Sequence, residues 1–195
     1  MKKIKLHDRD FRLALEAKVI DREIEKVAAQ INRELEGERP LFLGVLNGAF
    51  MFVSDLLKCI TIEGTEVSFV KIASYVGVSS TGNVQDVIGL RENIEGRTVV
   101  IVEDMIDSGE SIMHLKKMLA ERHPKQVKVA TMFYKPNALK YDLTIDYKCI
   151  ALENDFVVGR GLDYDGVGRN YPDLYTIENL KLKIENDKKM MSFSV

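Results

Sequence analysis

The sequence has little of what marks secreted, membrane-embedded or fibrous proteins. Its 195 residues include 2 cysteines, which form neither a CxxC motif nor a disulfide framework. No apolar stretch approaches the roughly 20 residues of a membrane span, and the N-terminal segment lacks the apolar run of a signal peptide. With 4 prolines and 13 glycines, the composition gives no sign of collagen or of a low-complexity linker. We therefore expect a soluble, cytoplasmic protein with no membrane partner.

An excess of basic residues is also missing. The 28 lysines and arginines face 30 aspartates and glutamates, so the formal net charge is -2. A general nucleic-acid-binding protein normally carries a basic excess, and the balance argues against a nucleic-acid partner. A small phosphorylated substrate stays possible, because it needs only a few local donors. Neither GxxxxGK[ST] nor GxGxxG occurs, which argues against a P-loop ATPase or a dinucleotide site.

Apolar periodicity predicts strands that alternate with helices. The first helix is expected over 21–36, with Asp21 as its N-cap and Gly37 and Pro40 ending it. The alternation predicts an α/β fold, a single domain of 1–195 with a mostly parallel sheet covered by helices on both faces. A long loop is expected over 77–86. Further helices are predicted at 49–60 and 110–123, and strands at 41–46, 66–75, 97–104, 127–134, 148–152 and 156–159.

The richest chemistry follows the strand predicted at 97–104. That apolar strand ends in two adjacent acids, Glu103 and Asp104, and Asp107 follows before a helix. The carboxyl end of a parallel strand beside a helix N-terminus is where anionic ligands bind. Backbone N–H groups of 108–111 suit a phosphate, and the acids suit sugar hydroxyls or Mg²⁺. A merely solvated helix cap would not explain two acids at the end of so apolar a strand.

This run resembles the signature of the type I phosphoribosyltransferases, and as VEDMIDSGES it is most similar to their hypoxanthine-guanine branch. Four further segments resemble family segments in the expected order: the pyrophosphate loop (44–52), the active-site lid (74–83), the purine-recognition strand (127–136) and the base-stacking segment (155–174). The resemblance covers most of residues 20–180 and leaves 181–195 as a tail. It implies that family's fold, with a small hood and a mobile active-site loop, and a homodimer or homotetramer.

The resemblance implies purine salvage. A phosphoribosyl group would pass from phosphoribosyl pyrophosphate to hypoxanthine or guanine, giving IMP or GMP and pyrophosphate with Mg²⁺ as cofactor. Three alternatives stay open: a transferase of the same fold for another base such as xanthine, adenine or a pyrimidine, an RNA-binding regulator of the same fold, and a relative that binds without catalysis.

The resemblance also implies a role for each site residue, with Asp107 as the acid/base group facing the purine N7. From the residues alone, a lysine such as Lys135 is usually solvated and a phenylalanine such as Phe156 usually belongs to the core. The set implied for phosphoribosyl pyrophosphate is Glu103, Asp104, Asp107, Ser108, Gly109, Glu110, Ser111, Asn47, Gly48 and Arg169. The purine set is Ile106, Lys135, Phe156, Val157 and Asp163; the lid residues are Ser74 and Tyr75; the Mg²⁺ ligands are Glu103, Asp104 and Asp163.

Asn47 departs from the family pattern, which commonly has lysine or arginine at this position. In the family, the Leu46–Asn47 peptide is often cis and turns a backbone N–H toward pyrophosphate. Asn47 keeps that backbone but cannot supply a positive charge. We therefore expect a different pyrophosphate affinity or subunit coupling.

Overall fold

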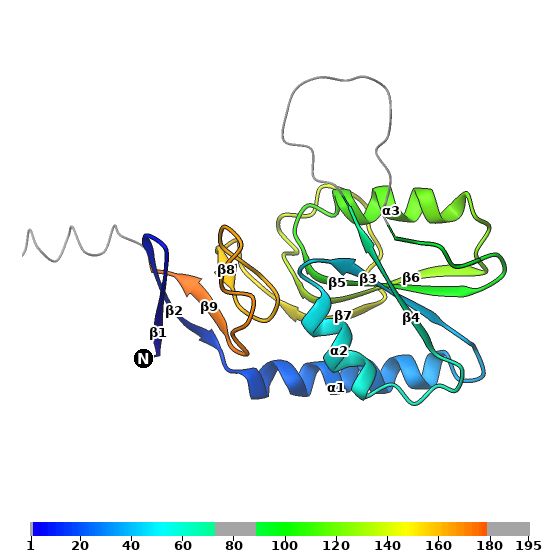
Figure 1. The fold of residues 1–195 in the computed structure, drawn as a ribbon, viewed down its shortest axis with the longest axis horizontal. Coiled ribbons are helices and arrows are strands. Elements are labelled where there is room, and N and C mark those ends of the chain that lie inside the picture. Colours follow the sequence, from blue (N-terminus) through cyan, green and yellow to red (C-terminus); the bar gives the residue numbers. More distant parts are fainter. Residues whose placement is uncertain (1, 73–88, 179–195) are drawn as a thin grey trace, which may run out of the picture.

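The computed structural model of the chain describes residues 2–72 and 89–178. The strands form a five-stranded core sheet, ordered β4-β3-β5-β6-β7, and a four-stranded sheet, ordered β1-β2-β9-β8 (Figure 1). The four-stranded sheet, together with residues 159–173 between β8 and β9, is here called the hood. In chain order the elements are β1 (Lys3–Leu6), β2 (Arg9–Leu15), α1 (Ala17–Glu34), β3 (Leu41–Leu46), α2 (Phe50–Lys58), β4 (Glu66–Lys71), β5 (Thr98–Ile106), α3 (Glu110–Ala120), β6 (Gln126–Tyr134), β7 (Tyr147–Ala151), β8 (Val157–Val158) and β9 (Leu174–Ile177).

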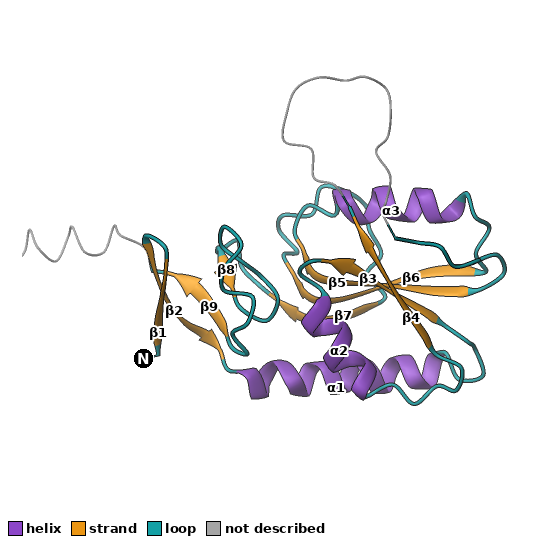
Figure 2. Cartoon of the chain, viewed as in Figure 1, coloured by secondary structure: helices purple, strands orange, loops and turns teal. Residues whose placement is uncertain are grey.

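The core sheet is parallel throughout, so the carboxyl ends of its strands share one edge. Helices α1 and α2 cover one face and α3 covers the other (Figure 2). Because side chains alternate along a strand, Val100 and Val102 of β5 belong to the core cluster of α1 and α2, whereas Val99 and Ile101 belong to that of α3. Burial on both faces accounts for the nearly continuous apolar sequence of these strands. The predicted α/β fold with a mostly parallel sheet is confirmed.

The hood joins the two ends of the described chain. Strand β9 pairs with β2 and with β8, all antiparallel. Its small core contains Leu6, Phe11, Val158 and Tyr175. The strand predicted at 156–159 is therefore present as β8, in the hood and not in the core sheet. Strands β1, β2 and β9 were not predicted: β1 and β9 have only four residues each, and in β2 exposed polar residues interrupt the apolar ones.

The predicted start of the first helix is wrong. Helix α1 begins at Ala17, so Asp21 lies inside it, and Glu16 at the N-cap position makes no side-chain capping bond. Instead the carboxylate of Asp173, in the hood, accepts a hydrogen bond from the Ala17 N–H at 2.9 Å. A cap supplied from 156 residues away leaves no local signal in the sequence. At the other end the helix stops at Glu34, just before the expected terminators.

The carboxylate of Asp173 ties the hood to α1, and its removal is expected to be measurable. Lys2 at 2.5 Å and the Ala17 N–H hold the pKa of Asp173 below its ordinary value. Asp173→Ala removes the cap and is expected to lower the free energy of unfolding by about 1 kcal/mol. A carboxyl group with a lowered folded pKa stabilises above its unfolded pKa and loses that contribution as the pH falls through the folded value. The deficit, measured by urea unfolding, should therefore shrink from about pH 7 to about pH 3.

Asp173→Asn is the matched control for this prediction, because it keeps an acceptor for Ala17 but not the charge. We expect a smaller loss that changes little with pH. A deficit of Asp173→Ala that is equal at both pH values would contradict the charge argument.

Both cysteines are free and half-buried against the core cluster of α1 and α2. Burial raises the pKa of the Cys149 thiol to about 12, which fits a small apolar role. None of the helices within 2–72 and 89–178 has the length and apolar character needed to cross a membrane. Part of the strand predicted at 66–75, the loop at 77–86 and the tail at 181–195 lie outside the described residues.

Candidate active site

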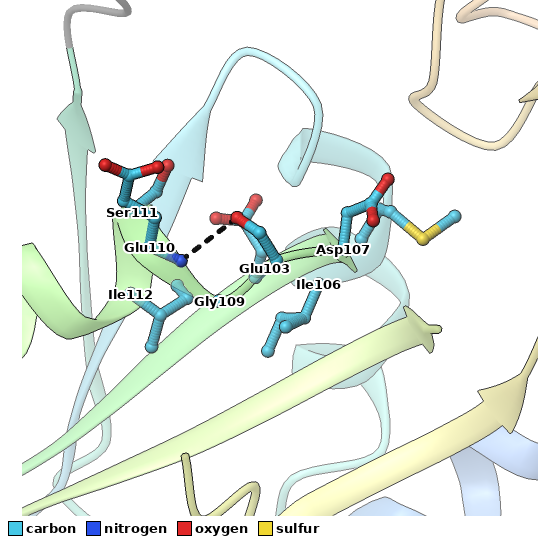
Figure 3. A pocket seen from close by; sticks show the side chains of 9 residues that line it. Glu103, Ile106, Asp107, Gly109, Glu110, Ser111 and Ile112 are labelled. Atoms are coloured by element: carbon cyan, nitrogen blue, oxygen red, sulfur yellow. Dashed lines mark hydrogen bonds between the residues drawn. The ribbon is translucent and has the colours of Figure 1, made fainter. Parts of the chain in front are cut away.

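The candidate site lies at the carboxyl end of β5, where the chain turns into α3 (Figure 3). A pocket of about 260 Å³ is found there. Gly109 precedes α3 with φ +83°, in the left-handed region that favours glycine, and the Glu110 N–H donates to the Ser108 hydroxyl at 3.3 Å. The first turn of α3, whose backbone N–H groups lack intrahelical acceptors, lines this pocket, as an anion site requires. The pocket is lined by Glu103, Met105, Ile106, Asp107, Ser108, Gly109, Glu110, Ser111 and Ile112.

Two adjacent carboxylates are buried at the end of β5. Glu103 is 9% exposed and Asp104 is 8% exposed. Burial raises the pKa of both, and the charge of Asp104 raises that of Glu103 further. Backbone N–H groups donate to both acids: that of Asp104 to the Glu103 carboxylate at 3.2 Å, and that of Met105 to the Asp104 carboxylate at 2.9 Å. Within 2–72 and 89–178, neither acid forms an ion pair, so a cation is the partner that this pair lacks.

The loop after β3 packs directly on this acid pair. The Leu46–Asn47 peptide is cis, and Asn47 is exposed. A Cβ on Gly48 would lie 1.7 Å from Asp104 Oδ2, so no side chain fits there. On its other side, Gly48 touches the hood: a Cβ on Gly161 would lie 2.1 Å from the Gly48 carbonyl oxygen. The loop, the end of β5 and the hood therefore meet at Gly48.

Lys135 lies beside Asp107. Strands β5 and β6 are parallel neighbours, and the Lys135 N–H donates to the Ile106 carbonyl at 2.9 Å. This places the Lys135 ammonium 3.1 Å from Asp107 Oδ2. The lysine side chain is 13% exposed and that of Asp107 is 57% exposed. Adjacent strand ends thus bring together two residues that are 28 positions apart in the sequence.

Arg169 and Asp163 face the same region from the hood. Arg169 pairs with Asp163 at 2.6 Å and donates to the Gly161 carbonyl at 2.8 Å. Asp163 also accepts the Gly166 N–H at 2.7 Å. The positive charge of Arg169 opposes the rise in the pKa of Asp104, so the arginine lies near enough to act on the acid pair.

The structure argues against Ile106 as a base-covering side chain. Ile106 is 1% exposed and packs in the core cluster of α3, and in Figure 3 it points to the opposite side of the chain from Asp107. Its neighbour Met105 is half-buried and packs with the cluster that also contains Val157. Strand alternation was the signal that distinguishes the two, and it favours Met105.

Phe156 is 46% exposed, so it presents a free ring surface. Its ring packs edge-on against Tyr164, with centroids 5.8 Å apart, and is tilted against Phe11 at 6.3 Å. Hood aromatics thus hold an exposed ring beside half-buried Val157. The predicted lid residues, Ser74 and Tyr75, lie outside the described residues.

The residues able to hold a metal ion here are those with carboxylate oxygens. Glu103 and Asp104 offer two buried carboxylates without a cation, a donor set that suits Mg²⁺. The described part of the chain shows no cluster of three or more ligands. Two carboxylates are nevertheless enough for an ion that completes its shell with substrate oxygens and water.

Comparison with known proteins agrees with this geometry. Residues 14–165 match the family described as Phosphoribosyl transferase domain. A hypoxanthine-guanine phosphoribosyltransferase of Streptococcus pyogenes serotype M3 is 38% identical over 154 residues, which cover 78% of this chain and 85% of that protein. One from Streptococcus agalactiae serotype V is 39% identical over 148 residues, covering 75% and 82%.

Solved structures give the same result. A hypoxanthine phosphoribosyltransferase from Staphylococcus aureus aligns with a TM-score of 0.79 and 32% identity, over 86% of this chain and 91% of that one. One from Trypanosoma cruzi aligns with a TM-score of 0.78 and 28% identity, over 85% and 94%. By its family match, its relatives and its fold, the chain belongs to the phosphoribosyltransferase family.

Proposed function

We propose that this chain is a purine salvage enzyme. It transfers a phosphoribosyl group from phosphoribosyl pyrophosphate to hypoxanthine or guanine, giving IMP or GMP and pyrophosphate. The observation that carries the proposal is the joint placement of three groups at one sheet edge: the buried Glu103–Asp104 pair, residues 108–111 (the anion loop) and the Lys135–Asp107 pair. The relatives named as hypoxanthine-guanine phosphoribosyltransferases support the same substrates.

The proposed seat of phosphoribosyl pyrophosphate runs from the β5–α3 loop to the hood. The 5′-phosphate binds the backbone N–H groups and hydroxyls of 108–111, and the ribose hydroxyls face Glu103 and Asp104. Pyrophosphate binds between the backbone of 47–48 and Arg169, whose forked donors suit phosphate oxygens. Arg169 would exchange its contact with Asp163 for the substrate.

Magnesium is part of this proposal. Glu103 and Asp104 would hold the ion, and Asp163 a second one once Arg169 has turned to pyrophosphate. When bound, Mg²⁺ neutralises charge that develops on the leaving pyrophosphate.

The purine is proposed to bind between Phe156 and Met105, with the Val157 backbone at its edge. Lys135 donates to the 6-oxo group, which separates hypoxanthine and guanine from adenine. Asp107, released from Lys135 as that lysine turns to the base, exchanges a proton with N7. The Lys135–Asp107 ion pair supports this proposal, because it brings the two residues together at one position.

A four-base assay tests this function. With phosphoribosyl pyrophosphate and Mg²⁺, we expect nucleotide from hypoxanthine and guanine but not from adenine, because adenine offers no carbonyl to Lys135. Excess EDTA should abolish turnover, and added Mg²⁺ should restore it. Xanthine is included because a hypoxanthine-guanine-xanthine phosphoribosyltransferase aligns with a TM-score of 0.74 at 30% identity. Adenine as the best substrate, or no transfer to any base, would reject the proposal.

Assembly and location belong to the same proposal. A homodimer or homotetramer, a single domain and a cytoplasmic site of action follow from the family resemblance and the unpaired cysteines. Light scattering of the purified protein measures the first of these.

A further inference from the structure

A buried arginine in the hood is bound to both helices under the core sheet. The Arg160 side chain is 5% exposed. Its guanidinium forms ion pairs with Asp21 of α1 and, at 2.9 Å, with Asp55 of α2. The same group donates to the Pro172 carbonyl at 3.3 Å. One side chain thus joins the hood to two helices of the core.

The backbone gives no reason for an arginine at this position. Arg160 has φ +53°, a conformation uncommon for residues other than glycine. It stands between Gly159 at φ +101° and Gly161 at φ +104°. An unfavourable backbone conformation of this kind must be stabilised by its surroundings, and the ion pairs with Asp21 and Asp55 provide that stabilisation.

The residue next to Arg160 touches both candidate pyrophosphate contacts. Gly161 N–H donates to the Arg169 carbonyl at 3.0 Å, and the Gly161 carbonyl accepts from the Arg169 guanidinium at 2.8 Å. Gly161 also packs on the Gly48 carbonyl so closely that a Cβ would lie 2.1 Å from the oxygen. A shift of the Arg160 backbone would therefore move Gly161, and with it the position of Arg169 and the contact with Gly48.

We propose that Arg160 is a positioning residue for the pyrophosphate half of the site. Its ion pairs to Asp21 and Asp55 fix Gly161 against Gly48, and this contact places Arg169. The buried guanidinium itself does not reach the substrate. The inference rests on the proposed function, because it assumes that Gly48 and Arg169 bind pyrophosphate. It implies that loss of Arg160 weakens binding of phosphoribosyl pyrophosphate and pyrophosphate, and leaves binding of the free base nearly unchanged.

Arg160→Met tests the inference, because it keeps much of the side-chain volume and removes the charge. We expect KM for phosphoribosyl pyrophosphate to rise about tenfold, and KM for hypoxanthine to change less than about threefold. Calorimetric titration with inorganic pyrophosphate and MgCl₂ should show a similar rise in Kd. Arg160→Lys should recover part of the loss, because one ammonium cannot serve two carboxylates and a carbonyl as a guanidinium does.

Two further variants separate positioning from general stability. Asp21→Asn removes one partner that is 50% exposed, so the fold should persist even if Arg160→Met fails to fold. We expect KM for phosphoribosyl pyrophosphate to rise about threefold while KM for hypoxanthine stays nearly unchanged. Lys58→Met is the matched control: it removes the other ion pair of Asp55, at 2.8 Å, and leaves Arg160 in place, so both KM values should stay unchanged.

Equal changes in both KM values, or unchanged constants with a lower melting temperature, would overturn the inference. If the wild-type protein transfers no phosphoribosyl group, the proposed function fails instead. If it does transfer the group, and the pyrophosphate Kd of both Arg160→Met and Asp21→Asn equals that of the wild type, only the role of Arg160 fails.

Discussion

Replacing Asp107 with asparagine is expected to reduce turnover by about 10²–10⁴-fold while leaving both substrates bound. The carboxylate stands where the anion loop meets Lys135, 3.1 Å from the lysine ammonium, so it is placed to exchange a proton with a bound base. Asparagine keeps the size and an acceptor oxygen but cannot carry the proton. The measurement is kcat, together with KM for hypoxanthine and for phosphoribosyl pyrophosphate.

The matched control for this variant is Glu25→Gln, which neutralises an exposed acid on α1, on the opposite face of the core sheet from α3. It should leave kcat unchanged. Wild-type turnover by Asp107→Asn would remove Asp107 from the proton transfer, and a large rise in both KM values with little loss of kcat would show a binding role instead.

Gly48→Ala is expected to have the second large effect. The new Cβ would lie 1.7 Å from Oδ2 and 2.4 Å from Cγ of the buried Asp104 carboxylate. The carboxylate, the loop after β3 or the end of β5 must therefore shift, and a shift of about 1 Å at a site of this kind costs roughly 100-fold in kcat/KM. Overpacking should also lower the free energy of unfolding by about 1–3 kcal/mol.

Gly96→Ala separates the two effects of that substitution. Gly96 has φ +68° and nothing within 4 Å of its Cβ position, so alanine there strains the backbone but presses on no neighbour. We expect a loss of stability with normal kinetics. If Gly48→Ala behaves in the same way, the close contact with Asp104 has no bearing on the site.

The sequence predicts the core sheet well, because strands buried on both faces are apolar along their whole length. The apolar runs at 41–46 and 97–104 are continuous, and continuous runs are typical of parallel strands covered on both faces. The acid pair and the anion loop follow such a run directly, so their shared location at one sheet edge also follows from the sequence.

Features that depend on distant partners could not be predicted in this way. Helix α1 begins at Ala17 because Asp173 caps it, and hood strand β2 finds its partner β9 at the opposite end of the chain. The contact of Gly48 with Asp104 and Gly161 likewise requires three segments to be in place. Met105 differs from these, since the period of two along β5 already separates it from Ile106.

The pairing of β2 with β9 has a consequence for how the protein is made. The core strands, from β3 to β7, end at Ala151, and a nascent chain of that length already contains the whole parallel sheet. The hood sheet needs residues 174–177, and so does every contact that depends on it. Pairings of such long sequence separation form slowly. During synthesis on the ribosome, the carboxylate pair of β5 is therefore built well before Arg169 can reach it, and the two halves of the site are joined last.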